Sequence, residues 1–446
     1  MIEEILQLIE EKNFFKVKNL IKDIHVPDIA SLLTEIDDTT TVIKVFRLLP
    51  KTTGAEVFAE IDSDLQETIA HALNDKELSY IMEELYTDDA VDFIEEMPAN
   101  VVERALKSST PETRKVINKF MSYTEGTAGA VMTSEFLDLR ADSTVKQALT
   151  RIRNNGKDRE TINVLYITDN SRVLTGVVSI RDILTEEEDT KISEIMESNV
   201  VFANTNTNQE DMANTFKKYD FIALPIVDNE QRLVGIVTVD DIFDVLEEEV
   251  TEDFEKMAGI TADNNDDPYL KTNPFRLASR RIIWLTALMI SAIFTGFLIS
   301  IYEDAFVMFP ELIACLPMLM GTGGNCGTQT STLIIRGLAT NELTLKDFFK
   351  IFFKEMRVSF IIGAVLSVFT LIRVAVQYGD WLLASAVSGS LMIVILIANF
   401  LGFALPLLAK KLKLDPALMA TPIITTILDC CVVLVYFSLA SAVLGI

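Results

Sequence analysis

The chain has 446 residues, of which 39 are Lys or Arg and 65 are Asp or Glu, and its formal net charge at pH 7 is −26. This excess of carboxylates argues against a nucleic-acid-binding protein, because phosphate backbones are bound by basic patches. The four cysteines, Cys315, Cys326, Cys430 and Cys431, lie in hydrophobic segments without a CxxC motif, which argues against a zinc site or a secreted disulfide framework.

The charge divides the chain into two parts. Residues 271–446 contain 13 basic and 9 acidic residues, so residues 1–270 carry the other 26 basic and 56 acidic ones. An acidic cytosolic region therefore precedes a hydrophobic membrane region. Carboxylates at this density suit hard divalent cations, which prefer oxygen ligands.

Residues 1–125 are expected to form an acidic, all-α N-domain. Their amphipathic runs are short and are interrupted at Pro50 and Pro98. Two runs, 56–61 and 92–97, resemble each other, which indicates a stack of degenerate helical hairpins.

Residues 126–246 contain an internal repeat. The segment 165–183 holds a hydrophobic run, an Asp-Asn turn and a second run that begins with Gly, and the same order recurs 59 residues later. Each copy predicts a helix, a strand, a hairpin turn, a strand and a helix. The first copy has about five extra residues near 154–160. The pair resembles tandem CBS domains, which are α/β regulatory modules that often sense adenosine nucleotides or divalent metals.

Residues 247–272 are expected to form an acidic connecting helix, which ends near Gly259, and a polar linker. A helix that joins a sensor to a membrane domain can transmit motion between them.

Residues 273–446 contain five hydrophobic segments, which predict an all-α membrane domain of five transmembrane helices. Basic residues gather in the segments before the first helix, between the second and third, and between the fourth and fifth. The positive-inside rule then places the N-terminus in the cytoplasm and the C-terminus outside, as in a multi-pass plasma (inner) membrane protein.

Asp429 is the only charged residue among the last 31 residues. A carboxylate near the middle of a membrane costs about 3 kcal/mol or more, so it usually faces a partner or a wet pathway. Thr421, Thr425 and Asp429 recur every four residues, which places them on one helix face. We interpret this face as the lining of a cation pathway. The alternative is an ion pair of Asp429 with Arg336 or Arg373.

The second hydrophobic segment contains four glycines together with amides and hydroxyls, which do not suit a lipid-facing helix. Gly324 and Gly327 would let helices approach closely, while Asn325 and Gln329 would hydrogen-bond hydrated ions or hold the pore helices. The alternative is a contact between small residues that is reinforced by polar side chains.

Several motifs together resemble the signature of the MgtE family of magnesium channels and transporters: Gly321–Gln329, Thr332–Thr340, and Asp415-Pro416 followed by Asp429. The order of the domains is similar to that family over essentially the full length. The resemblance implies a homodimeric, Mg²⁺-selective channel or transporter in the lipid bilayer, closed by cytosolic Mg²⁺. It leaves open whether ATP binds to the CBS pair.

The resemblance also implies residue roles, with Asp429 as the selectivity carboxylate and Asp415 as an acid at the cytoplasmic mouth. Regulatory Mg²⁺ would bind to acids of the N-domain, the CBS pair and the connecting helix: Glu56, Asp88, Asp92, Asp220, Asp241, Asp244, Glu249, Glu252 and Asp253. Spacing alone also fits solvated acidic helix faces. The sequence departs from a common family form around Gly327, so it assigns no role to Thr328.

The sequence leaves two alternative functions open. One is a broader divalent transporter that passes Mn²⁺, Co²⁺ or Ca²⁺, and another is a membrane-tethered CBS sensor that does not transport. An enzyme is not expected, because the sequence has no HExxH, GxSxG or P-loop motif.

Overall fold

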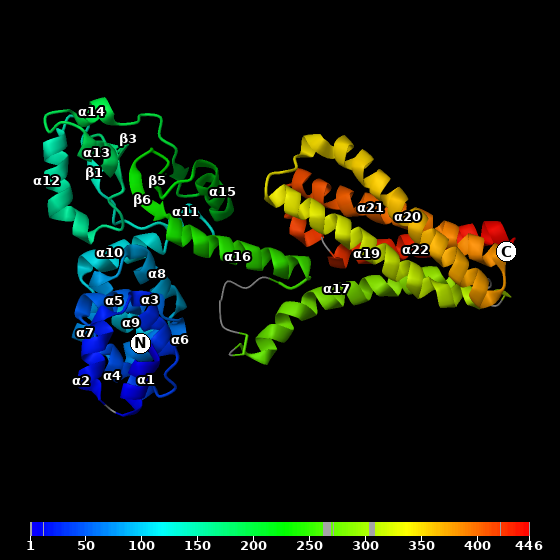
Figure 1. Cartoon of the computed structure of the whole chain (residues 1–446), viewed down its shortest axis with the longest axis horizontal. Coiled ribbons are helices and arrows are strands. Elements are labelled where there is room, and N and C mark those ends of the chain that lie inside the picture. The colour runs from blue at the N-terminus through cyan, green and yellow to red at the C-terminus, as the bar shows by residue number, and fades with distance from the viewer. Residues whose placement is uncertain are drawn as a thin grey trace. The chain divides into compact units, whose positions relative to one another are not determined.

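The structure is a computed structural model that describes the chain apart from residues 1, 12, 262–268, 271, 303–307, 420 and 446 (Figure 1). The side chains of residues 2, 3, 10, 419, 421 and 422 also lie outside the described part. The structure separates into two compact units, Met1–Glu247 and Glu248–Ile446. Most of the expected polar linker therefore falls outside the described residues, as does the side chain of Thr421.

The first unit begins with the N-domain, in which the described residues form ten α-helices. They are α1 Ile2–Glu10, α2 Phe14–Leu20, α3 Val26–Thr34, α4 Thr39–Phe46, α5 Lys51–Glu60, α6 Ser63–Ala72, α7 Asp75–Glu84, α8 Thr87–Glu96, α9 Ala99–Ser108 and α10 Pro111–Phe120. Capping side chains such as Asp38, Asp62 and Asn74 accept hydrogen bonds from backbone N–H groups in the first turn of each helix. These N–H groups have no partner inside the helix. The buried ring of Phe58 packs edge-on against Phe46 and Phe93. The prediction of an all-α N-domain is confirmed.

The CBS pair consists of two copies of one small α/β motif. The first contains α11 Ala128–Val131, β1 Asp138–Leu139, α12 Val145–Asn155, β2 Val164–Thr168, β3 Leu174–Ser179 and α13 Ile180–Thr185. The second contains α14 Ile192–Ile195, β4 Ala203–Asn204, α15 Gln209–Tyr219, β5 Ala223–Val227 and β6 Leu233–Thr238. In each sheet the first strand is parallel to the second, and the second is antiparallel to the third.

The two hairpin turns are built alike, as the repeat predicts. Oδ1 of Asp169 accepts hydrogen bonds from the backbone N–H groups of Ser171 and Val173, at 2.7 and 2.9 Å. Oδ1 of Asp228 accepts the two equivalent bonds, at 2.8 and 2.9 Å. An aspartate that bonds to the backbone two residues later favours a turn, which explains why both copies place Asp at this point.

The connecting helix is the continuation of the last helix of the second CBS copy. One helix, α16, runs without interruption over Val239–Met257, so the expected start at residue 247 falls inside it. No Gly or Pro lies between its ends to break it, although the composition changes sharply there. The helix ends before Gly259, whose φ of +71° is the left-handed conformation that glycine adopts easily.

The second unit contains five long helices among its described residues: α17 Pro274–Ser300, α19 Glu311–Ala339, α20 Phe348–Tyr378, α21 Trp381–Lys411 and α22 Thr421–Leu444. Two 3₁₀ turns, η3 Leu345–Asp347 and η4 Pro416–Met419, precede α20 and α22. Helix α21 packs against α19, α20 and α22, and α17 packs against α22 (Figure 1).

Four of the described helices are long and apolar enough to cross a membrane: α17, α20 with η3, α21 and α22. The sequence predicted α19 as a fifth. Its 29 residues extend about 44 Å, which is long enough to cross a bilayer. Glycines, amides and hydroxyls, however, occupy the middle of this helix and lower its hydropathy. The position of helix α19 in the membrane therefore depends on packing against neighbouring helices rather than on its own hydropathy.

Helices α19 and α21 approach each other tightly at Gly327 and Gly402. A Cβ atom at Gly402 would lie 2.5 Å from the carbonyl oxygen of Gly327. We expect Gly402→Ala to lower the free energy of unfolding by about 1–3 kcal/mol, because the two backbones must separate. Thermal unfolding in detergent measures this change. Gly296→Ala is the control, because a Cβ there meets no atom within 4 Å. Equal unfolding temperatures for both variants would contradict the packing described here.

Candidate functional site

Acidic side chains from three segments gather within the first unit, where the N-domain meets the CBS pair. Helix α8 contributes three, the first turn of α16 contributes two, and the segment after α12 contributes one: Asp88, Asp89, Asp92, Asp240, Asp241 and Glu160. We call these residues the α8–α16 cluster.

The α8–α16 cluster holds like charges close together in partly buried surroundings. Burial, followed by repulsion from Asp89 and Asp241, raises the pKa of Asp88 well above its usual range. Burial and neighbouring carboxylates likewise raise the pKa of Asp89 to about 6 and of Asp92 to about 7. The pKa of Glu160 rises to about 8, chiefly through burial and then through Asp241. The causes of these shifts are chiefly burial and neighbouring carboxylates, which both disfavour the charged form of a carboxyl group.

Glu135 fastens α8 to the CBS pair beside this cluster. Its carboxylate accepts hydrogen bonds from the backbone N–H of Thr87 at 3.2 Å and from the Thr87 hydroxyl at 2.8 Å. It also accepts bonds from the Thr133 hydroxyl at 2.7 Å and from the backbone N–H of Ser134 at 3.0 Å. A negative charge at the start of a helix is stabilised by the unpaired N–H groups there. Glu135 therefore holds the acid-bearing turn of α8 in place.

The structure brings together some of the regulatory acids expected from the sequence and leaves others at exposed positions. Asp88, Asp92 and Asp241 belong to the α8–α16 cluster. Glu56 is exposed on α5. Asp220 is exposed and ends α15 in a left-handed conformation, while Asp244 lies on an exposed part of α16.

Four residues of this region were not predicted from the sequence: Asp89, Glu135, Glu160 and Asp240. The extra residues near 154–160 of the first CBS copy were the available signal for Glu160, because an insertion in one copy of a repeat marks a local difference in function. Asp89 and Glu135 carried no comparable signal, since their partners come from distant segments.

The donor set of the α8–α16 cluster suits a divalent cation such as Mg²⁺, which binds one or two carboxylates and keeps several waters. In the part of the chain that the structure describes, no three His, Cys, Asp or Glu side chains are arranged closely enough to enclose an ion. The cluster thus has the chemistry of an outer, water-mediated site rather than of a closed cage.

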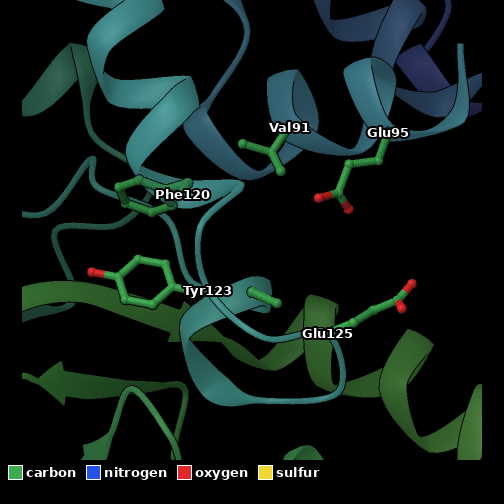
Figure 2. Close-up of a pocket in the computed structure, with 6 residues that line it drawn as sticks. Val91, Glu95, Phe120, Tyr123 and Glu125 are labelled. Atoms are coloured by element: carbon green, nitrogen blue, oxygen red, sulfur yellow. The ribbon is translucent and has the colours of Figure 1, made fainter.

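A pocket of about 200 Å³ lies beside α8 (Figure 2). Glu95 of α8 and Glu125 face each other across it, and the rings of Phe120 and Tyr123 form a wall. Burial, followed by the charge of Glu125, raises the pKa of Glu95. The pocket therefore adds acidic surface to the same helix.

A second group of charges lies within the second unit, at the end of α16. Nζ of Lys256 is 2.7 Å from Oδ2 of Asp415 and 2.7 Å from Oε1 of Glu252. Burial, followed by repulsion from Asp415, raises the pKa of Asp253 to about 6. Glu249 adds to that repulsion. The predicted acids thus do gather here, but a lysine that was not predicted stands between them.

Apolar and ionic contacts attach this end of α16 to the membrane helices. Met257 packs against Ile335 of α19 and Ala417 of η4. Arg280 of α17 pairs with Glu255 and donates a hydrogen bond from Nε to the Thr261 carbonyl at 2.8 Å. The group of acidic side chains around Asp415 therefore comes from both α16 and the segment that precedes α22.

Asp429 lies half-buried on α22, one turn after Thr425. Two glycines of α19 allow α22 to pack closely against it. A Cβ at Gly324 would lie 3.3 Å from the Thr425 methyl group, and one at Gly327 would lie 2.6 Å from Leu428. Gly324 and Gly327 therefore occupy the close helix contact that their residue type predicts.

Two other predicted residues of α19, Asn325 and Gln329, are exposed and lie four residues apart. Neither alternative partner of Asp429 is paired with it in the described residues: Arg336 is exposed, and Nη1 of Arg373 contacts Sδ of Met318 at 3.2 Å.

Family models match all three regions of the chain. One described as the MgtE intracellular N domain matches residues 24–126, and CBS domains match residues 128–189 and 192–248. A model described as a divalent cation transporter, MgtE, matches residues 316–439.

Similar proteins extend over nearly the whole chain. A protein called Magnesium transporter MgtE from Thermus thermophilus is 36% identical over 98% of this chain and 97% of its own length. A protein of the same name from Bacillus subtilis is 32% identical over 99% and 97%. The crystal structure of the cytosolic domain of the Mg²⁺ channel MgtE in complex with ATP has a TM-score of 0.52 and 34% identity, covering 55% of this chain and 100% of that one. The chain therefore belongs to the MgtE family of divalent cation transporters.

Proposed function

We propose that this chain carries Mg²⁺ across the plasma membrane and that cytosolic Mg²⁺ closes its pathway. The observation that carries the proposal is Asp429, a lone half-buried carboxylate on an apolar helix that packs against the glycine face of α19. The names of the full-length relatives, which are magnesium transporters, support Mg²⁺ as the cargo.

Asp429 would act as the site that admits divalent cations. A carboxylate in surroundings of low dielectric constant attracts a divalent ion more strongly than a monovalent one. Mg²⁺ gives up its water reluctantly, so one carboxylate from each subunit of a homodimer, bridged by waters, suits it better than a closed cage. Two facing Asp429 side chains would repel each other unless a cation lay between them.

Closure would follow from relief of repulsion in the two acidic groups. A cation that bridges α8 and the start of α16 would favour the docked N-domain, and a cation near Asp415 would favour the attached end of α16. A ligand shifts such an equilibrium only by its difference in affinity for the two states. Several weak sites that act together would give a steep response.

Three further parts of the proposal concern ligands, assembly and orientation. ATP binding to the CBS pair is proposed because a similar cytosolic domain was crystallised with ATP. The homodimer rests on the family resemblance. The cytoplasmic N-terminus and external C-terminus rest on the distribution of basic residues.

Replacing the pathway carboxylate tests the transport proposal directly. We expect Asp429→Asn to lower Mg²⁺ uptake into liposomes by about tenfold or more, since a lost contact of about 1.4 kcal/mol already corresponds to tenfold. Glu342→Gln is the charge-matched control on an exposed loop and should transport normally. Normal uptake by Asp429→Asn would place the pathway elsewhere. Absence of uptake by the unaltered chain would favour the sensor, and competition by Mn²⁺, Co²⁺ or Ca²⁺ would measure selectivity.

Neutralising the α8–α16 cluster tests the gate. The test variant carries three substitutions together: Asp88→Asn, Asp92→Asn and Asp241→Asn. We expect the internal Mg²⁺ concentration that halves Mg²⁺ uptake to rise by about tenfold in this variant, within the usual range of coupling between sites. The control removes the same charge from the exposed run as Glu186→Gln, Glu187→Gln, Asp189→Asn. Inhibition that is unchanged in the first variant, or equally weakened in both, argues against a specific site.

The raised pKa values of the cluster predict how stability depends on pH without divalent cations. Asp89, Asp92 and Glu160 have folded pKa values of about 6, 7 and 8, above the unfolded values of about 4. The folded chain therefore binds more protons than the unfolded one in this range, so stability falls as the pH rises from about 5 to about 8. Thermal unfolding in EDTA measures this slope, and Mg²⁺ should flatten it. A midpoint that rises with pH in EDTA would contradict the electrostatic account.

A further inference from the structure

A group of polar side chains lies buried between α19, α20 and α21. Asn399 of α21 exposes 1% of its surface, Ser359 of α20 exposes 0%, and Thr330 of α19 exposes 6%. Buried polar groups are costly unless they are hydrogen-bonded, and between membrane helices they have little competing water.

Hydrogen bonds connect these side chains into one chain across three helices. The Thr330 hydroxyl donates to Oδ1 of Asn399 at 3.1 Å, and Nδ2 of Asn399 donates to the Ser359 hydroxyl at 2.7 Å. Ser359 in turn donates to the backbone carbonyl of Glu355 at 2.6 Å. The carboxylate of Glu355 also lies 3.4 Å from the Thr330 hydroxyl. Asn399 is central, because both ends of its amide are used.

This chain of bonds lies beside a tight contact of α19 and α21. A Cβ at Gly402 would lie 2.5 Å from the Gly327 carbonyl oxygen and 3.0 Å from Cβ of Thr330. Thr330 and Gly327 are less than one turn apart on α19, as are Asn399 and Gly402 on α21. The hydrogen bonds therefore fix how α19 is rotated where the two backbones meet.

The rotation of α19 determines how α22 is seated. On α19, Gly324 faces Thr425 of α22 and Gly327 faces Leu428 of α22. Asp429 immediately follows Leu428 and shares a helix face with Thr425. A small rotation of α19 would replace this glycine surface with larger side chains and would displace α22 at the level of Asp429.

We propose that Thr330, Asn399 and Ser359 form a hydrogen-bonded clamp that positions α19 and, through its glycines, the carboxylate of Asp429 for selection of Mg²⁺. This inference rests on the proposed function of Asp429. The clamp residues do not line the pathway; they are positioning residues that act through α19.

Two variants of Thr330 separate the hydroxyl from the volume of the side chain. Thr330→Val keeps the volume and removes the hydroxyl, while Thr330→Ser keeps the hydroxyl. The readout is the ratio of Mg²⁺ to Ca²⁺ uptake by the full chain in liposomes. We expect Thr330→Val to lower this ratio by about threefold to tenfold, as suits the loss of one interhelical hydrogen bond. Thr330→Ser should keep the ratio of the unaltered chain.

The clamp is overturned if Thr330→Val keeps the ratio of the unaltered chain, or if Thr330→Ser lowers it as much as Thr330→Val does. Should Thr330→Val fail to fold, Ser359→Ala breaks the other end of the clamp with little change in volume. It is then expected to lower the ratio in the same direction, and an unchanged ratio overturns the proposal.

Asp429→Asn in the same assay keeps the two proposals apart. Normal transport by Asp429→Asn would remove the proposed pathway, whatever the clamp variants do. Loss of transport in Asp429→Asn together with an unchanged ratio in Thr330→Val would overturn the clamp alone.

Discussion

The structure depends on carboxylates that are held close together without enough positive charge to balance them. In the α8–α16 cluster the cost appears as raised pKa values at Asp88, Asp92 and Glu160, each caused first by burial. Hydrogen bonds from Thr87 to Glu135 and the hydrophobic core shared by the N-domain and the second CBS copy oppose that repulsion. A divalent cation would add positive charge there, and so would change a balance that these hydrogen bonds and packing maintain.

The two acidic groups act on one helix. Asp241 is in the first turn of α16 and Lys256 is in its last, and the whole helix is continuous over its 19 residues, about 28 Å. An α-helix resists bending because each turn is hydrogen-bonded to the next. In the proposed gating, cations at the two ends would both change the free energy of this helix, which is how weak sites could add their effects.

Local signals in the sequence predicted the domains, and distant contacts were beyond its reach. The repeat was visible because Asp169 and Asp228 form turns with their own neighbours. The strands β1 and β4 were missed because two residues are too few to show alternation. The boundary at 247 marks a change of composition inside the continuous helix α16, because a change of composition does not break a helix. Asn399 and Lys256 could not be assigned, since their partners lie far away in the chain.

The position of Lys256 has a consequence for how the transporter is tuned. Its ammonium group lies 2.7 Å from both Glu252 and Asp415, so in the proposed gating an arriving Mg²⁺ would replace one positive charge by two instead of filling an empty site. The net gain is smaller than the full charge of the ion, which moves the response to higher concentrations. Under the proposed gating, Lys256 would therefore set the Mg²⁺ concentration of the response without being a metal ligand, and a substitution there would shift it while leaving every carboxylate in place.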